Sequence, residues 1–71
     1  MQTTKYNGMT IAEVAKSRNW GNRPTEEEPG CFKLNRCLVK VEDGIVVDAE
    51  VWDIYGNEYR HAQADFYRRH G

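Results

Sequence analysis

The sequence has no long hydrophobic run, and this absence excludes several classes of protein. The first residues, MQTTKYNGM, contain no apolar segment of signal-peptide length, and no later stretch is long enough to span a bilayer. We therefore expect a cytoplasmic protein. The sequence also lacks the G-x-S-x-G, P-loop, G-x-G-x-x-G and H-E-x-x-H motifs, so no common catalytic motif points to an enzyme.

An excess of basic residues is also missing. The net charge is −1, whereas a general nucleic-acid binder is clearly basic. The chain has 71 residues, so we expect one domain spanning 1–71. A domain of this size buries only about 60% of its extended-chain surface, and pockets for small ligands usually need about 300 Å³ or more. The small size favours a binding protein over an enzyme, and the charge disfavours a general nucleic-acid binder.

Cysteine is scarce, with Cys31 and Cys37 alone. In one strand the two would lie about 20 Å apart, whereas a disulfide needs Cα atoms within about 7 Å, so we expect reduced, partly buried thiols. Together with His61 and His70 they offer four zinc ligands, but the spacing lacks a close cysteine pair. We therefore expect no metal and no cofactor. A nucleophilic set of Cys37, His61 and Asp53 is also disfavoured, because the register below points the thiol and the carboxylate to opposite faces.

The first predicted element is a helix at about 10–19, within MTIAEVAKSRNWG. Thr10 and Glu13 have the T-x-x-E spacing of a capping box, in which each side chain bonds the backbone N–H of the other residue. Gly21 is the predicted stop. The next stretch, GNRPTEEEPG at 21–30, has two prolines and no apolar period, so it predicts a connecting loop.

From Cys31 onward the hydrophobic pattern changes to a period of two, which indicates strands. We favour a three-residue turn, Glu42-Asp43-Gly44, because it sets Val39 opposite Val47 and keeps apolar residues on one face. A two-residue turn would set Val39 opposite Asp48 and mix the faces. A second turn is predicted at Gly56-Asn57, before a third strand.

The C-terminal segment fits two structures. A third strand at about 58–63, followed by a helical turn at 64–71, agrees with the Gly-Asn turn. A helix agrees with Asn57 as N-cap, acidic residues early and basic residues late. The strand is preferred. The predicted fold is therefore α+β, with a short N-terminal helix packed on a three-stranded antiparallel meander at about 31–63. A hairpin followed by a C-terminal helix is one alternative.

A small barrel is the other alternative. The stretch CLVKVEDGIVVDAEVWDIYGNEYRHAQADF has a strand, a D-G turn, a G-N turn and a D-F near its end. In this it resembles the strand run of SH3-like and tudor-like barrels, over less than half of the chain. The resemblance implies a fold only. It carries no ligand and no site, because no aromatic cage is assigned.

The segment VEDGIVVDAEVWDIYGNEYR concentrates negative charge, with six carboxylates before its single basic residue. A β-bulge near Val51 would point three of these carboxylates outward, an acidic stripe made of Asp48, Glu50 and Asp53. The other predicted partner-binding residues are Glu42 and Asp43 beside the turn, and Trp20, a residue type enriched in binding hot spots. A solvated face with no binding role explains the same pattern.

These features favour a non-enzymatic protein-binding module that acts as an inhibitor or adaptor on a larger protein with a basic surface. In size and style it is similar to phage-encoded inhibitors of host systems, including anti-CRISPR proteins. Homodimer formation through a free sheet edge is also open. The alternative function is nucleic-acid binding by the basic, aromatic C-terminus. Its candidate residues are Arg60, Tyr67, Arg68 and Arg69.

Overall fold

The computed structural model describes residues 2–52 and 57–70. It has five strands in one antiparallel sheet and two helices. In chain order the elements are β1 (Gln2–Thr3), α1 (Ile11–Ser17), β2 (Thr25–Glu28), β3 (Cys31–Leu34), β4 (Cys37–Glu42), β5 (Ile45–Val51) and α2 (Asn57–His70). The strand order is β1-β5-β4-β3-β2, so β2 to β5 form a meander and the N-terminal β1 adds to its far side. The α+β class is confirmed.

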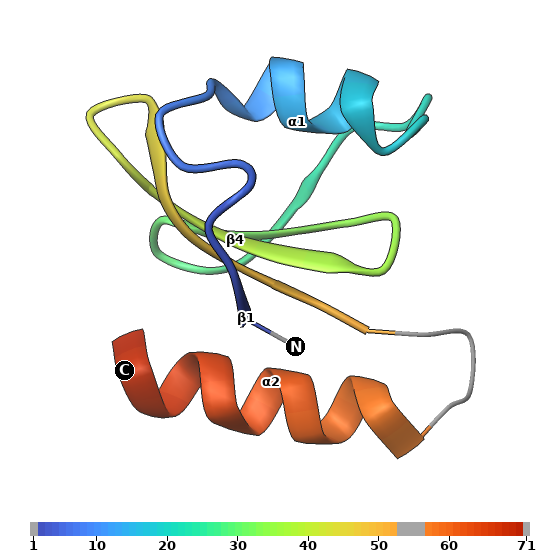
Figure 1. Cartoon of the computed structure of the whole chain (residues 1–71), viewed down its shortest axis with the longest axis vertical. Helices are drawn as coiled ribbons and strands as arrows, with labels where there is room; N and C mark the ends of the chain where they lie inside the picture. The colour runs from blue at the N-terminus through green and yellow to red at the C-terminus, as the bar shows by residue number, and fades with distance from the viewer. Residues whose placement is uncertain (1, 53–56, 71) are drawn as a thin grey trace.

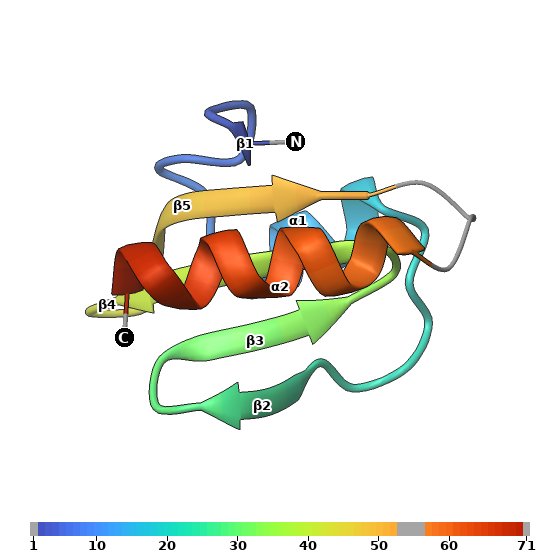
Figure 2. The same cartoon turned by 90° about the horizontal axis from the view of Figure 1, so that it is seen from below.

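The helices lie on opposite faces of the sheet, which makes three layers (Figure 1). Seen from below, α2 runs across the middle of the sheet, with β2 and β1 at its two edges (Figure 2). The two edges are separate, so the sheet is open and the small-barrel alternative is wrong. No helix in the described part of the chain has the length and apolar character needed to cross a membrane.

Each face of the sheet has its own hydrophobic cluster. The larger cluster lies on the α1 side, and its buried members are Tyr6, Val14, Leu34, Cys37, Val39, Val46 and Ala49. The smaller cluster lies on the α2 side and consists of buried Cys31, Leu38 and Phe66, with Trp52 and Tyr67 packed against it. A sheet covered on both sides needs apolar residues of both parities, which explains why the alternation along the strands is incomplete.

Helix α1 begins as predicted and ends earlier. The Thr10 hydroxyl accepts from the Glu13 N–H at 3.2 Å, and the Glu13 carboxylate accepts from the Thr10 N–H at 3.1 Å, so the capping box is confirmed. The helix ends at Ser17, because Asn19 adopts a left-handed conformation (φ 56°). The N–H of Trp20 then bonds the carbonyl of Ala15 at 2.8 Å, a Schellman arrangement that stops the helix before Gly21.

The predicted loop at 21–30 is partly wrong, because it contains the edge strand β2. All four residues of β2 are exposed, so the strand shows none of the hydrophobic alternation by which a strand is recognised in a sequence. The two cysteines lie in separate strands, β3 and β4, joined by a two-residue turn. Both are free and buried, as expected, and they belong to clusters on opposite faces of the sheet.

The predicted three-residue turn between β4 and β5 is wrong. Glu42 pairs with Ile45, so the turn has two residues, Asp43 and Gly44, and both have positive φ (54° and 80°). Such turns match the right-handed twist of paired strands, and Asp-Gly is a preferred sequence for them. A β-bulge restores the apolar register, because Val47 is an extra residue and Val39 therefore pairs with Ala49. The predicted bulge therefore lies at Val47 and not near Val51.

The preferred C-terminal strand is also wrong, since residues 57–70 form α2. The helix buries Ala62 and Phe66 at helical spacing, and half-buries Tyr59 and Tyr67. This covers the second face of the sheet, where Leu38 would otherwise be exposed. The helical alternative is therefore confirmed. Gly56 and Asp53 lie outside the described residues.

Candidate protein-binding surface

The acidic stripe is not an exposed surface. Asp48 and Glu50 are only 7% and 4% exposed, because their parity on β5 turns them toward α2. The predicted outward orientation is wrong for both residues. The third member, Asp53, lies outside the described residues. Buried carboxylates are rare unless they are paired, so we expect both residues to contact cationic side chains.

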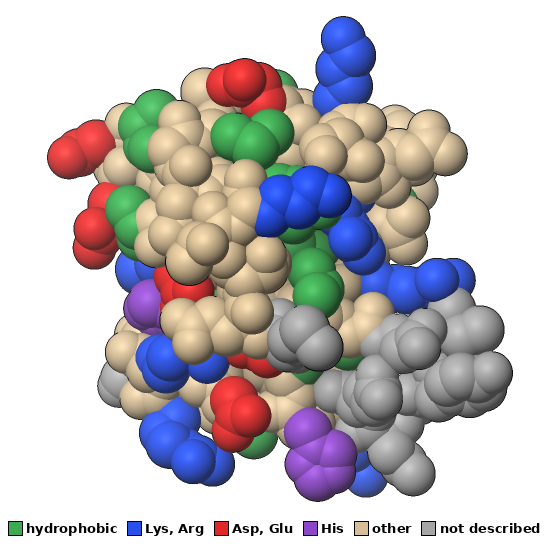
Figure 3. Space-filling view, viewed as in Figure 1, with side chains coloured by type: hydrophobic (Ala, Val, Ile, Leu, Met, Phe, Trp, Pro, Cys, Tyr) green, Lys and Arg blue, Asp and Glu red, His purple; other side chains and the backbone are tan. Residues whose placement is uncertain are grey.

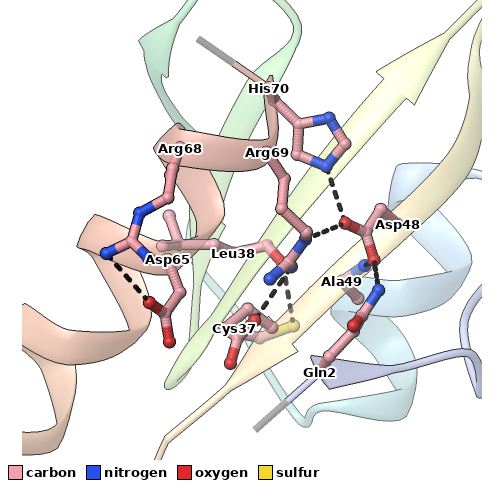
Figure 4. A network of polar contacts seen from close by, with 10 residues as sticks. Gln2, Cys37, Leu38, Asp48, Ala49, Asp65, Arg68, Arg69 and His70 are labelled. Carbon is pink, nitrogen blue, oxygen red and sulfur yellow. Dashed lines mark hydrogen bonds and ion pairs between the residues drawn. The ribbon is translucent and has the colours of Figure 1, made fainter.

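Three side chains converge on the carboxylate of Asp48 (Figure 4). Arg69 Nε and His70 Nε2, from the last turn of α2, lie 3.0 and 2.6 Å from Asp48 Oδ2. Gln2 Nε2 from β1 lies 3.3 Å from Oδ1, which also accepts from the Ala49 N–H at 2.8 Å. These contacts fix α2 and β1 to the same strand.

Arg69 joins the two acidic residues into one network. Its Nη2 donates to Glu50 Oε1 at 2.8 Å while its Nε holds Asp48. Burial alone would raise the pKa of Asp48, but the hydrogen bonds from His70, Arg69 and Gln2 outweigh it and lower that pKa. Burial alone would lower the pKa of Arg69, and its bonds to Glu50 and Asp48 outweigh that effect and raise it. Asp48 and Arg69 are therefore both charged at neutral pH.

This arrangement predicts that acid weakens the fold through Asp48. Because its pKa is lower in the folded state than in the unfolded chain, the ionised carboxylate stabilises the fold above the unfolded-state value. That contribution is lost as the pH falls below about 4 and through the folded-state pKa. We expect Asp48→Asn to lose less stability on acidification than the parent. Urea unfolding between about pH 7 and about pH 3 measures this, and equal slopes for both proteins would contradict it.

A different acidic surface is exposed. Glu42 and Asp43 are exposed at the β4–β5 turn, and neither makes an ion pair with another described residue. Beside them, Ile45 and Val47 are each 39% exposed, and they are the large hydrophobic residues that the described chain leaves exposed. We call these four residues the hairpin tip. Figure 3 shows carboxylates and hydrophobic side chains side by side at this end of the molecule.

Trp20, predicted as an interface anchor, lines a groove of about 530 Å³ beside α1. The indole is half-buried and packs against the larger core cluster. Its Nε1–H is buried without a hydrogen-bond partner among the described residues. An unpaired buried donor costs about 1–3 kcal/mol. The groove residues are Ile11, Ala12, Ala15, Lys16, Asn19, Trp20, Gly21 and Pro24.

The basic C-terminal residues do not form one patch. Arg69 turns into the buried network, and Arg68 pairs with Asp65 at 3.6 Å on the exposed side of α2. Arg60 is exposed. The Tyr67 hydroxyl contacts Glu27 at 3.3 Å, and burial together with this carboxylate raises the pKa of Tyr67 to about 12. The ring is thus held against β2, which leaves less of it free to stack on a base.

The thiols are poor nucleophiles in this environment. Burial raises the pKa of Cys31, and it raises that of Cys37 to about 11, so both are protonated at neutral pH. Cys37 faces α1, whereas His61 belongs to α2 on the opposite face, so the two do not converge.

A second hollow of about 360 Å³ is lined by Cys31, His70 and Tyr67 with Glu28 and Pro29. Within the described ranges no three potential ligands gather as a metal site.

Sequence reasoning missed two functional groupings. It did not find the partners of Asp48 and Glu50, although the spacing 62, 66, 69 and 70 puts Arg69 and His70 on the face of α2 that carries Ala62 and Phe66. Treating the C-terminus as a helix would have revealed this. It also missed the exposure of Val47, which depends on the position of the bulge.

Comparisons with protein families, curated proteins and solved structures gave no match to this chain.

Proposed function

We propose that this protein is a non-enzymatic protein-binding module, and that the hairpin tip is its contact surface. The observation that carries the proposal is the pairing of exposed Ile45 and Val47 with the carboxylates of Glu42 and Asp43. Apolar side chains supply burial on association, and the charges select the partner and steer its approach. The tip replaces the acidic stripe in this role.

The partner chemistry follows from the tip. Two carboxylates without an ion pair in the described structure favour a partner with a basic surface that also offers an apolar contact. Surfaces of this kind often belong to proteins that bind nucleic acid. A module that covers such a surface competes with the nucleic acid, so it acts as an inhibitor. A module that leaves a second surface free acts as an adaptor.

The rigidity of the turn supports this role. Asp43 and Gly44 form a tight turn, and Ile45 bridges to Thr10 at the start of α1. The Met9 carbonyl also accepts from the Val46 N–H at 2.8 Å. These contacts hold the tip in one conformation before a partner arrives. Little conformational entropy is then lost on binding.

The test uses a variant that changes the tip and keeps its backbone. Glu42→Gln with Asp43→Asn removes two charges, and Asn-Gly is as suitable as Asp-Gly for this turn. Ile45→Thr and Val47→Thr keep β-branched side chains that suit a strand. We expect the fourfold variant to fold like the parent and to bind the partner at least about tenfold more weakly.

The partner is first captured from a nuclease-treated lysate of the source cells, and its affinity is then measured with purified proteins by calorimetry. Glu28→Gln with Asp65→Asn is the matched control, since it removes two carboxylates elsewhere. Equal affinity for the parent and the tip variant would reject the tip. Loss of all capture after nuclease treatment would favour the nucleic-acid alternative through Arg60 and Arg68.

A further inference from the structure

The groove beside α1 is an apolar hollow of about 530 Å³, larger than the hollow of about 360 Å³ beside Cys31. It lies along one side of the short helix, with Trp20 and Pro24 at its far end. Ile11, Ala15 and Trp20 line it and also pack against the core, so its floor is part of the folded structure. A preformed apolar floor is the usual setting of a binding site.

The charge of the groove is opposite to that of the tip. Among the described residues that line it, Lys16 carries the charge, and exposed Arg23 precedes Pro24 in the chain. Lys16 makes no ion pair with another described residue. A negatively charged group at this rim would therefore be attracted to the groove.

Trp20 contributes its indole ring to the wall of the groove. Its Nε1–H is buried and has no partner among the described residues. Because this atom is buried, an occupant of the groove contacts the indole ring and does not reach the N–H.

We propose that this groove binds an acidic, apolar peptide segment of a protein partner. Leucine-like side chains fill the hollow between Ile11 and Pro24 and pack against the Trp20 ring, and a carboxylate pairs with Lys16. The inference goes beyond the proposed function, because it adds a second docking surface with the opposite charge preference. With the hairpin tip it gives the domain two separate contacts, as an adaptor requires.

The two indole N–H signals of the chain provide the test. Nitrogen–proton correlation spectra of the ¹⁵N-labelled protein contain one signal each from Trp20 and Trp52, assigned with Trp20→Phe. The probes are two soluble helical peptides with leucine on one face, one carrying glutamate and the other lysine on the opposite face. We expect the acidic peptide to move the Trp20 signal saturably and to leave the Trp52 signal in place.

Variants connect the shift to the groove. Lys16→Glu should weaken binding of the acidic peptide about fivefold, as expected for an exposed ion pair. Ala12→Gln places a longer side chain in the groove while keeping a good helix former, and it should abolish the shift. Arg60→Glu makes the same charge change on α2 and should leave the affinity unchanged.

Several results would overturn the proposal. These are the absence of a saturable Trp20 shift at millimolar acidic peptide, equal Trp20 shifts with both peptides, or movement of the Trp52 signal alone. A Trp20 shift that follows protein concentration without peptide would instead identify a second copy of the chain as the occupant. The tip variant should keep the Trp20 shift, so failure of the tip and failure of the groove are distinguishable.

Discussion

Phe66→Ala is expected to lower the free energy of unfolding by about 3–5 kcal/mol. A domain of this size has a total stability of roughly 4–10 kcal/mol, so the variant should lose a large part of its stability. The reason is that Phe66 has no exposed surface and forms the buried cluster on this face together with Cys31 and Leu38. The centroid of the Phe66 ring also lies 4.8 Å from that of the His70 ring, so removal of the Phe66 ring loosens the last turn of the helix.

Urea unfolding followed by circular dichroism measures this effect. Phe66→Leu provides a graded version, which keeps most of the apolar volume and should cost less than the alanine variant. Arg60→Ala is the control on the same helix, and as an exposed substitution it should change stability by no more than about 0.5 kcal/mol. A Phe66→Ala midpoint equal to that of the control would mean that α2 does not pack on the sheet.

Arg69→Met is expected to cost about 2–3 kcal/mol, because it leaves Asp48 and Glu50 buried with less compensation. This cost in stability is at or below the low end of the range for breaking a buried ion pair. The reason is that the Arg69 side chain is 30% exposed, so water partly screens the pair. Methionine keeps much of the length of the side chain and removes its charge. The loss therefore reports the network and not a cavity.

A double-mutant cycle isolates the network. In an Asp48→Asn, Glu50→Gln background the carboxylates are gone, so Arg69→Met should cost at least about 1 kcal/mol less than in the parent. Arg68→Met is the neighbouring control, because that side chain is 78% exposed and its 3.6 Å pair with Asp65 is worth little. Equal losses for Arg69→Met in both backgrounds would mean that the ion pairs do not stabilise the fold.

The features that were predictable from sequence are those that local chemistry determines. The capping box of Thr10 and Glu13 requires only adjacent residues in one turn, and the α+β class follows from the change of hydrophobic period after Cys31. The reduced state of the two cysteines was expected from their spacing, although the real reason is that they lie on opposite faces.

The features that were missed depend on contacts between distant segments. The alternation of residues disfavours the two-residue turn at Asp43 because that turn misaligns Val39, and only the bulge at Val47 removes the conflict. Strand β2 is polar throughout, so its pairing with β3 leaves no hydrophobic pattern. The outward orientation of Asp48 and Glu50 followed from treating the C-terminus as a strand, because no helix then covered that face.

The convergence on Asp48 has a consequence for how the chain folds during synthesis. Gln2, near one end, and His70, near the other, contact the two oxygens of one carboxylate. While the ribosome still holds the last turn of α2 in its exit tunnel, Arg69 and His70 cannot reach Asp48, and α2 does not yet cover Leu38 on its face of the sheet. Completion of the fold therefore waits until translation has released residue 70. A nascent chain stalled before that point is expected to be sensitive to proteases.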